Sequence, residues 1–293
     1  MSLGIVIDAS LLKRNPLPWP EGGSKENRGR VAIIGGSRDL SGAVFLAGVA
    51  ALRAGAGKLQ IATAESRAGH FATALPEALV TGLRETETGA LCQSNGAMLA
   101  SRLQGSDAIL VGPGMLETED TRTLVKQLAT NLANTPFVFD AGALDGITAG
   151  SLFAGRTLPV LTPHAGEMAN LLGIDRETIE SRPAEIAVTV ARDLNAVVVL
   201  KGAETYIADP VGTVWFYKGG GVGLGTSGSG DVLAGIVAGL LARGATPVEA
   251  SFWAVYLHGE AGAELAKTIG PLGFLAREIA DGIPRLMGQF PRS

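Results

Sequence analysis

The stretch GGGVGLGTSGSGDVLAGIVAGLLARG, residues 219–244, carries the densest structural signal of the sequence. A glycine-rich loop runs directly into an apolar helix, which we expect over residues 230–243. Backbone N–H groups at the start of a helix point toward a bound anion, and glycine lets a phosphate approach the main chain. The stretch therefore predicts a phosphate site at the mouth of this helix.

Asp231 lies in the first turn of that helix, beside the predicted anion site. A carboxylate there is placed to take a proton from a hydroxyl as the hydroxyl attacks a phosphoryl group. Alternatively, Asp231 caps the helix or offsets its dipole. A helix cap needs only one suitable residue and does not require a long glycine-rich loop before the helix. The presence of that loop therefore favours the catalytic interpretation.

Two better-known phosphate motifs do not explain this stretch. Residues 223–228 match GxGxxG, but no strand–helix–strand unit with an acidic residue about 20 positions on follows them. The P-loop pattern GxxxxGK[ST] is absent from the sequence. Phosphate binding must therefore use another arrangement.

Apolar strands alternate with helices on both sides of this stretch. Alternation of this kind predicts an α/β fold, with a mostly parallel sheet covered by helices on both faces, in a single domain over residues 1–293. The first 30 residues are expected to be an irregular lead-in, and Ser41 is the expected N-cap of the first long helix. We expect strands over 31–36, 59–63, 107–112, 136–140, 159–163 and 196–202, a hairpin over 205–209 and 213–217, and helices over 43–55, 119–132, 185–194, 230–243, 247–267 and 272–287.

The ends of the predicted strands carry residues that can bind or react. In open α/β sheets, ligands sit beyond the carboxyl ends of the strands. We therefore expect a site bordered by the strand ends at 35–37, 112–114, Asp140, 162–164 and 201–202.

Several of these side chains also have simpler interpretations. His164 is either structural or part of the site, and its strand-end position favours the site. Lys201 ends an apolar run, which is unusual for a surface lysine. Glu167 either meets a partner in the site or caps its helix, and Asp140 either positions a ligand or closes a turn. His258 lies within a long predicted helix and is interpreted as a buried packing or hydrogen-bonding residue.

Composition excludes several classes of protein. The 293 residues are 46% hydrophobic with 41 glycines, which is enough for a large core. The net charge is −4 and no run of Lys or Arg occurs, so a nucleic-acid surface is not expected. Cys92 is the single cysteine, which rules out an intrachain disulfide, and no role is assigned to it. No stretch has the apolar length of a membrane span, so we expect a soluble, cytoplasmic protein with no membrane partner.

The segment GTSGSGDVLAG resembles the C-terminal signature of ribokinase-like enzymes, in which a Gly-x-Gly-Asp turn forms an anion hole. Further segments are similar, in type and order, to the ADP/ATP-dependent NAD(P)H-hydrate dehydratases: GGSRDLSGA, ALPEAL, GPG, DAGAL, LTPHAGE, VLKGAET and YLHGEAG, within residues 35–262. This resemblance implies a three-layer αβα ribokinase-like fold with a mostly parallel central sheet. It begins almost at the N-terminus, so we expect the form that lacks the epimerase domain of many relatives.

The resemblance also implies an activity in metabolite repair. Such enzymes use ADP or ATP to phosphorylate the hydroxyl of hydrated NADH or NADPH. Loss of phosphate then restores the dihydronicotinamide. Mg²⁺ is expected for phosphoryl transfer, although the sequence shows no dedicated carboxylate cluster. Related proteins assemble as homo-oligomers, and the same is expected here.

The family's sites carry over onto matching residues of this sequence. Asp231 would be the general base and would also contact the substrate. The hydrate pocket would be lined by Ala43, Gly114, His164 and Asp231. The nucleotide would be held by Lys201, Gly202, Ala203, Glu204, Thr205, Gly228, Ser229 and Gly230.

Two positions depart from the family pattern. Many relatives have Asn where this chain has Gly221, and an aromatic residue where it has Leu40. Any side-chain contact made from those positions is lost here, which bears on nucleotide preference more than on the type of reaction.

Two other functions remain open from the sequence. A ribokinase-like kinase of a hydroxyethylthiazole or hydroxymethylpyrimidine alcohol is disfavoured by LTPHAGE together with GGS and SGA. A nucleotide-sensing binding protein is disfavoured by the intact Asp231. The sequence does not choose between ADP and ATP, between the epimers, or between NADH and NADPH.

Overall fold

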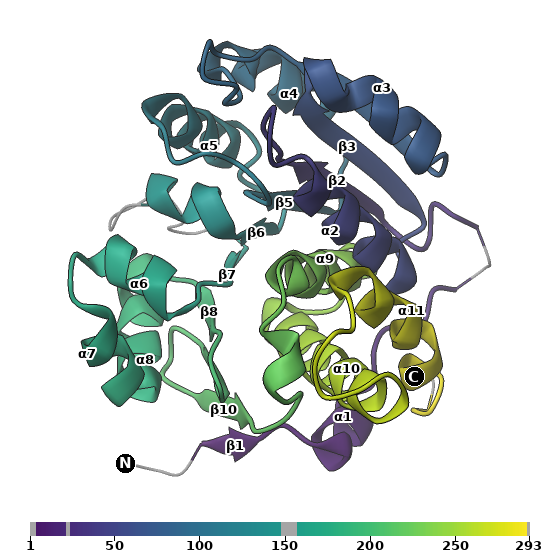
Figure 1. Cartoon of the computed structure of the whole chain (residues 1–293), viewed down its shortest axis with the longest axis vertical. Coiled ribbons are helices and arrows are strands. Elements are labelled where there is room, and N and C mark those ends of the chain that lie inside the picture. The colour runs from purple at the N-terminus through teal and green to yellow at the C-terminus, as the bar shows by residue number, and fades with distance from the viewer. Residues whose placement is uncertain (1–3, 22–23, 148–156, 292–293) are drawn as a thin grey trace.

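One sheet of ten strands runs through the protein (Figure 1). The structure is a computed structural model that describes residues 4–21, 24–147 and 157–291. The order across the sheet is β1-β10-β9-β8-β7-β6-β5-β2-β3-β4. The strands are β1 (Ile5–Val6), β2 (Arg30–Ile34), β3 (Lys58–Ala64), β4 (Ala78–Leu83), β5 (Ala108–Val111), β6 (Phe137–Phe139), β7 (Val160–Leu161), β8 (Val197–Leu200), β9 (Thr205–Ala208) and β10 (Val214–Tyr217).

The sheet is mostly parallel, as the sequence predicts. Within the described sheet only β9 runs against its neighbours, pairing antiparallel with both β8 and β10. The predicted hairpin is confirmed, with Trp215 opposite Ile207. Parallel strands of this kind place their carboxyl ends at one edge of the sheet, and the site lies there.

Helices cover both faces of the sheet and form three αβα layers. Alternate side chains of β2 point to opposite faces of the sheet. Val31 and Ile33 pack in the core on one face, and Ala32 and Ile34 pack in the core on the other. One layer holds α1 (Ala9–Arg14), α2 (Gly42–Arg53), α3 (Glu65–Ala74), α9 (Ser229–Ala242), α10 (Pro247–Thr268) and α11 (Ala276–Met287). The other holds α4 (Gly96–Arg102), α5 (Glu119–Asn131), α6 (Ala165–Leu172), α7 (Arg176–Ser181) and α8 (Pro183–Leu194).

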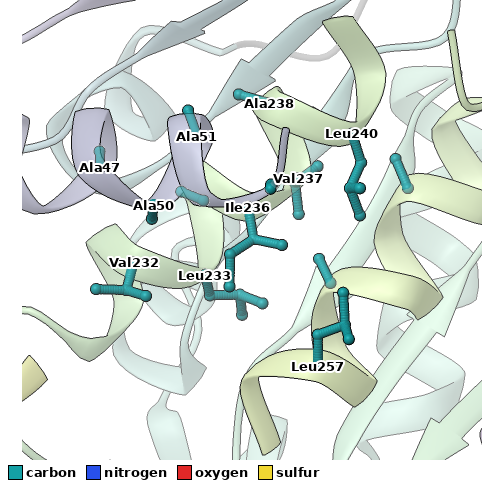
Figure 2. Close-up of a cluster of buried hydrophobic side chains, with 14 of the residues drawn as sticks. Ala47, Ala50, Ala51, Val232, Leu233, Ile236, Val237, Ala238, Leu240 and Leu257 are labelled. Atoms are coloured by element: carbon teal, nitrogen blue, oxygen red, sulfur yellow. The ribbon is translucent and has the colours of Figure 1, made fainter. Parts of the chain in front are cut away.

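Helices α2 and α9 pack with their backbones in close approach. A Cβ on Gly235 would overlap the carbonyl oxygen of Ala47, and one on Gly239 would overlap that of Ala51. Figure 2 shows alanines of α2 against the apolar side chains of α9, with Leu257 of α10 closing the cluster. This packing fixes the start of α9, where the anion site is predicted, relative to the start of α2.

The lead-in differs from the sequence expectation. Strand β1 pairs in parallel with β10, and α1 follows it, with the Asp8 carboxylate accepting the N–H of Leu11 at 2.8 Å. Leu11 and Leu12 are buried, so this short segment is held by tertiary packing that its irregular composition does not reveal. Residues 1–3 and 22–23 of the lead-in lie outside the described residues.

Other details of the prediction also need correction. Ser41 occupies the N-cap position of α2, but its side chain makes no capping hydrogen bond. The hydroxyl of Ser37 instead accepts the N–H of Leu40 at 3.2 Å, one turn earlier. The expectations also omitted β4 and the helices α3, α4 and α7, whereas the helix expected to begin near Gly166 is α6 (Ala165–Leu172). Among the described helices, none has the length and apolar character needed to cross a bilayer.

Candidate active site

Two cavities meet at the carboxyl edge of the sheet. The larger has a volume of about 1120 Å³ and the smaller about 760 Å³. Within the described residues, His164 is the one side chain that lines both. The first turn of α9 also reaches both, with Ser229 and Gly230 on the larger cavity and Asp231 on the smaller one.

The larger cavity collects nearly all the residues predicted to hold the nucleotide. They come from the end of β8, the turn into β9 and the start of α9. They are Lys201, Gly202, Ala203, Glu204, Thr205, Ser229 and Gly230. Gly228 lies on the smaller cavity instead, while Gly221 lines the larger one.

The smaller cavity brings together all four residues predicted to meet the hydrate. Ala43, Gly114, His164 and Asp231 all line it, and so does Leu40. Gly114 has φ +68°, and a Cβ on it would overlap the carbonyl oxygen of Leu40. Only glycine allows this approach, which closes one wall of the cavity.

The ammonium of Lys201 forms ion pairs with two carboxylates at the base of the site. Its Nζ lies 2.9 Å from Asp140 Oδ1 and 3.7 Å from Glu167 Oε2, and its side chain is 17% exposed. Burial acts to lower the pKa of Lys201, but the charges of Asp140 and Glu167 outweigh it and raise that pKa. Lys201 is therefore a fixed ammonium, and a Cβ on Gly230 would lie 3.3 Å from its Nζ.

Asp140 is buried, and one of its carboxylate oxygens has two partners. Its Oδ1 accepts the hydroxyl of Thr162 at 2.7 Å as well as the ammonium of Lys201. Thr162 is itself buried on β7's C-terminal side. Asp140 thus orients Lys201, a role that was not predicted, and its carbonyl oxygen also closes a turn by accepting the N–H of Ala143 at 3.1 Å.

Asp231 has the chemistry of a base at neutral pH. Burial and, after it, the charge of Asp140 raise its pKa to about 7 against the opposing charge of Lys201. The N-cap of α9 is Gly228, with φ 90°, so Asp231 is not the capping residue. A carboxylate poised near neutrality suits general base catalysis.

His164 and Glu167 form a reciprocal cap at the start of α6. The Nδ1 atom of His164 accepts the N–H groups of Gly166 at 2.9 Å and Glu167 at 3.1 Å. Glu167 Oε2 accepts the N–H of His164 at 2.7 Å while lying near Lys201. Both interpretations of Glu167 therefore hold, since it caps its helix and faces the site.

His258 is a buried hydrogen-bonding residue, as predicted. Its Nε2 lies 3.0 Å from the hydroxyl of Ser229 and 3.1 Å from the carbonyl oxygen of Ser229. Burial lowers its pKa to about 4, so it is neutral at physiological pH. It supports the first turn of α9 from below and also lines the larger cavity.

Several residues that line the cavities were not predicted from the sequence. Most come from α6, α7, β9 and β10, elements that approach the site only in the folded chain. They are Arg176, Glu180, Tyr206 and Tyr217 on the larger cavity, and Asp39, Leu46, Met115, Glu117 and Asn170 on the smaller one. Asp39 and Met115 had a signal in the sequence, since they follow the strand-end stretches 35–37 and 112–114.

Known proteins resemble this chain over most of its length. The family model of NAD(P)H-hydrate dehydratase matches residues 31–285. The ADP-dependent (S)-NAD(P)H-hydrate dehydratase of Xanthomonas campestris pv. campestris is 50% identical over 286 residues, covering 98% of this chain and 97% of that protein. The bifunctional NAD(P)H-hydrate repair enzyme Nnr of Moorella thermoacetica is 41% identical, covering 94% of this chain but 52% of that protein.

A solved structure shows the same fold. It is the ADP/ATP-dependent NAD(P)H-hydrate dehydratase of Bacillus subtilis, co-crystallised with ATP/Mg²⁺. The two chains superpose with a TM-score of 0.86 and 32% identity, over 99% of this chain and 100% of that one. The ribokinase-like architecture predicted from the sequence is therefore confirmed.

Proposed function

Because the chain belongs to the NAD(P)H-hydrate dehydratase family, we propose that it uses ADP to dehydrate the S form of hydrated NADH and NADPH. One observation carries the proposal. Two cavities of different lining share a boundary at the first turn of α9, and Asp231 stands at that boundary. Such an arrangement suits two ligands that exchange a phosphoryl group between them.

The larger cavity takes the nucleotide in this proposal. Lys201 and the N–H groups at the start of α9 face its phosphates, because a helix N-terminus and an ammonium both stabilise anionic oxygens. The loop from Gly202 to Thr205 lies along the nucleotide. ATP is accepted through the same contacts, with one further phosphate.

The smaller cavity takes the hydrated dihydronicotinamide. Its hydroxyl attacks the terminal phosphorus, the new O–P bond forms as the bond to the nucleotide breaks, and the hydroxyl proton passes to Asp231. The C–O bond then breaks with its electron pair going to the departing phosphate. A neighbouring ring carbon loses a proton and the double bond returns.

Mg²⁺ fits this site as an ion carried by the nucleotide. The described residues contain no group of three His, Cys, Asp or Glu side chains that could hold a metal. Asp140 is already bonded to Lys201 and Thr162. Mg²⁺ usually keeps several waters and binds substrate phosphates with one or two carboxylates, of which Glu167 is the candidate here. When bound, the ion would neutralise charge on the phosphates.

We place this reaction in the cytoplasm, in a homo-oligomer. The single cysteine suits a reducing compartment. Sedimentation of the purified protein would test the assembly, and a monomer at all concentrations would reject it.

The proposed activity is tested by incubating the purified protein with hydrated NADH and ADP, and separately with ATP. Recovery of the dihydronicotinamide absorbance with equal release of phosphate is expected. A stable phosphorylated product without recovery would indicate a kinase instead. Nucleotide binding without any turnover would indicate a sensor.

A further inference from the structure

The imidazole of His164 has a defined tautomer. Its Nδ1 accepts two backbone N–H groups, from Gly166 and Glu167. Nδ1 therefore carries the lone pair, and the neutral ring must carry its hydrogen on Nε2. The cap consequently turns Nε2 into an N–H donor of fixed orientation.

This donor lies where the two cavities meet. His164 lines both of them, and its side chain is 59% exposed. Among the described residues, Glu167 Oε1 approaches Nε2 to 3.6 Å, which is beyond hydrogen-bonding distance. The N–H is thus available to a ligand.

The backbone places His164 beside the anion site. His164 and Lys201 are partners in a parallel bridge, and the N–H of Lys201 donates to the carbonyl oxygen of Pro163 at 2.8 Å. The Nζ of Lys201 in turn approaches Gly230 in the first turn of α9. The imidazole N–H, the ammonium and the helix N-terminus are three sources of positive potential, and all three belong to residues that line the larger cavity.

We propose that His164 donates its Nε2 hydrogen bond to the phosphoryl group as it passes from the nucleotide to the hydrate. The inference rests on the proposed function and deepens it. Charge spreads over the equatorial oxygens during transfer, and a donor fixed in advance stabilises that charge without reorganisation. Glu167 acts through His164 as a positioning residue, because its carboxylate completes the cap.

Two substitutions separate the cap from the donor. In His164→Asn, the amide oxygen replaces Nδ1 as the cap, since Asn is a strong N-cap, but no N–H reaches the Nε2 position. In His164→Gln, the amide N–H reaches that position, but the side chain caps poorly. Stability and activity should therefore rank these variants in opposite orders.

The experiment measures kcat, both KM values and Tm for wild type and the two variants. We expect His164→Asn to keep its Tm and its affinity for ADP, and to lose about 100-fold in kcat, the size found for single oxyanion donors. We expect His164→Gln to melt at a lower temperature but to recover at least tenfold in kcat over His164→Asn.

Other results would overturn the inference. A His164→Asn variant that raises only the KM for the hydrate would make His164 a ground-state binding residue. Equal kcat values for the two variants would show that the N–H is not the acting group. An inactive wild-type protein would overturn the proposed function and this role together, whereas an active wild type with an unimpaired His164→Asn would overturn the role alone.

Discussion

The ammonium of Lys201 and the carboxylate of Asp140 form an ion pair of 2.9 Å beneath the first turn of α9. The same oxygen, Asp140 Oδ1, also accepts the hydroxyl of Thr162 at 2.7 Å. Asp231 lies within the field of both charges, and they act on its pKa in opposite directions. Burial is the main cause of the raised pKa of Asp231, and the ion pair adjusts that pKa without itself needing to react.

Activity should depend on pH through Asp231. A base works when ionised, and its pKa is raised to about 7, so kcat/KM should fall as the pH drops through 7. A pH profile with hydrated NADH and ADP measures this limb. A flat profile between pH 6 and about 8 would assign the base to another group.

Replacing Asp231 with Asn should remove turnover. The amide keeps the shape of the side chain but cannot take the hydroxyl proton, and loss of a general base costs about 10²–10⁴-fold. ADP binding, measured by calorimetry, should stay within about twofold, because the larger cavity is lined by Ser229 and Gly230 rather than by Asp231. Turnover near the wild-type rate would contradict the role of Asp231.

Substitutions at the ion pair should move the pH profile in opposite directions. Asp140→Asn removes a charge that raises the pKa of Asp231, so the acid limb should shift to lower pH. Lys201→Met removes a charge that lowers the same pKa, so the limb should shift to higher pH.

The two variants should also differ in stability. Lys201→Met leaves Asp140 buried without its cation, which costs about 3–5 kcal/mol in comparable pairs, and it should weaken ADP binding. Urea unfolding measures the loss of stability, and calorimetry measures the affinity for ADP.

If the acid limb of the pH profile shifted in the same direction in both variants, electrostatic coupling of the ion pair to Asp231 would be excluded.

His258 should make the protein less stable in acid. Its pKa is lowered from 6.5 to about 4, so the unfolded chain binds a proton between these pH values and the folded chain does not. The free energy of unfolding should therefore fall as the pH drops from 6.5 to 4, by about 3 kcal/mol at most from this group. His258→Gln should flatten that part of the stability profile, and an unchanged slope would contradict the assignment.

Gly235 should not tolerate even one methyl group. In Gly235→Ala, the Cβ meets the backbone of α2 at Ala47, so we expect a loss of about 1–3 kcal/mol in urea unfolding and a raised KM for the hydrate. Gly69→Ala in α3 is a matched control, because nothing lies within 4 Å of its Cβ. The control should gain up to about 1 kcal/mol, the intrinsic helix preference for alanine. Equal behaviour of the two variants would exclude close packing as the cause.

The sequence predicted the parts of the fold that have a strong local pattern. Buried strands such as β2 and β5 are continuous apolar runs, and α9 follows an unmistakable glycine-rich approach, so both were located correctly. Strand β1 has only two residues and α1 only six. They form because β1 pairs with β10 and α1 buries Leu11 and Leu12 in the core. No local pattern encodes that support.

Prediction of the site had the same limit. Strand-end residues such as Asp140, His164 and Lys201 were placed at one edge, because parallel topology brings strand ends together. The 2.7 Å hydrogen bond of Thr162 to Asp140 and the contacts of Glu167 with both His164 and Lys201 depend on atomic positions that only the folded chain supplies.

The contact between α2 and α9 has a consequence for ligand fit. Ala43 near the start of α2 and Asp231 near the start of α9 both line the smaller cavity. The spacing of the two helices is fixed one and two turns further along, where Gly235 meets Ala47 and Gly239 meets Ala51. Interior residues that contact no ligand therefore help to determine which hydrate fits the smaller cavity.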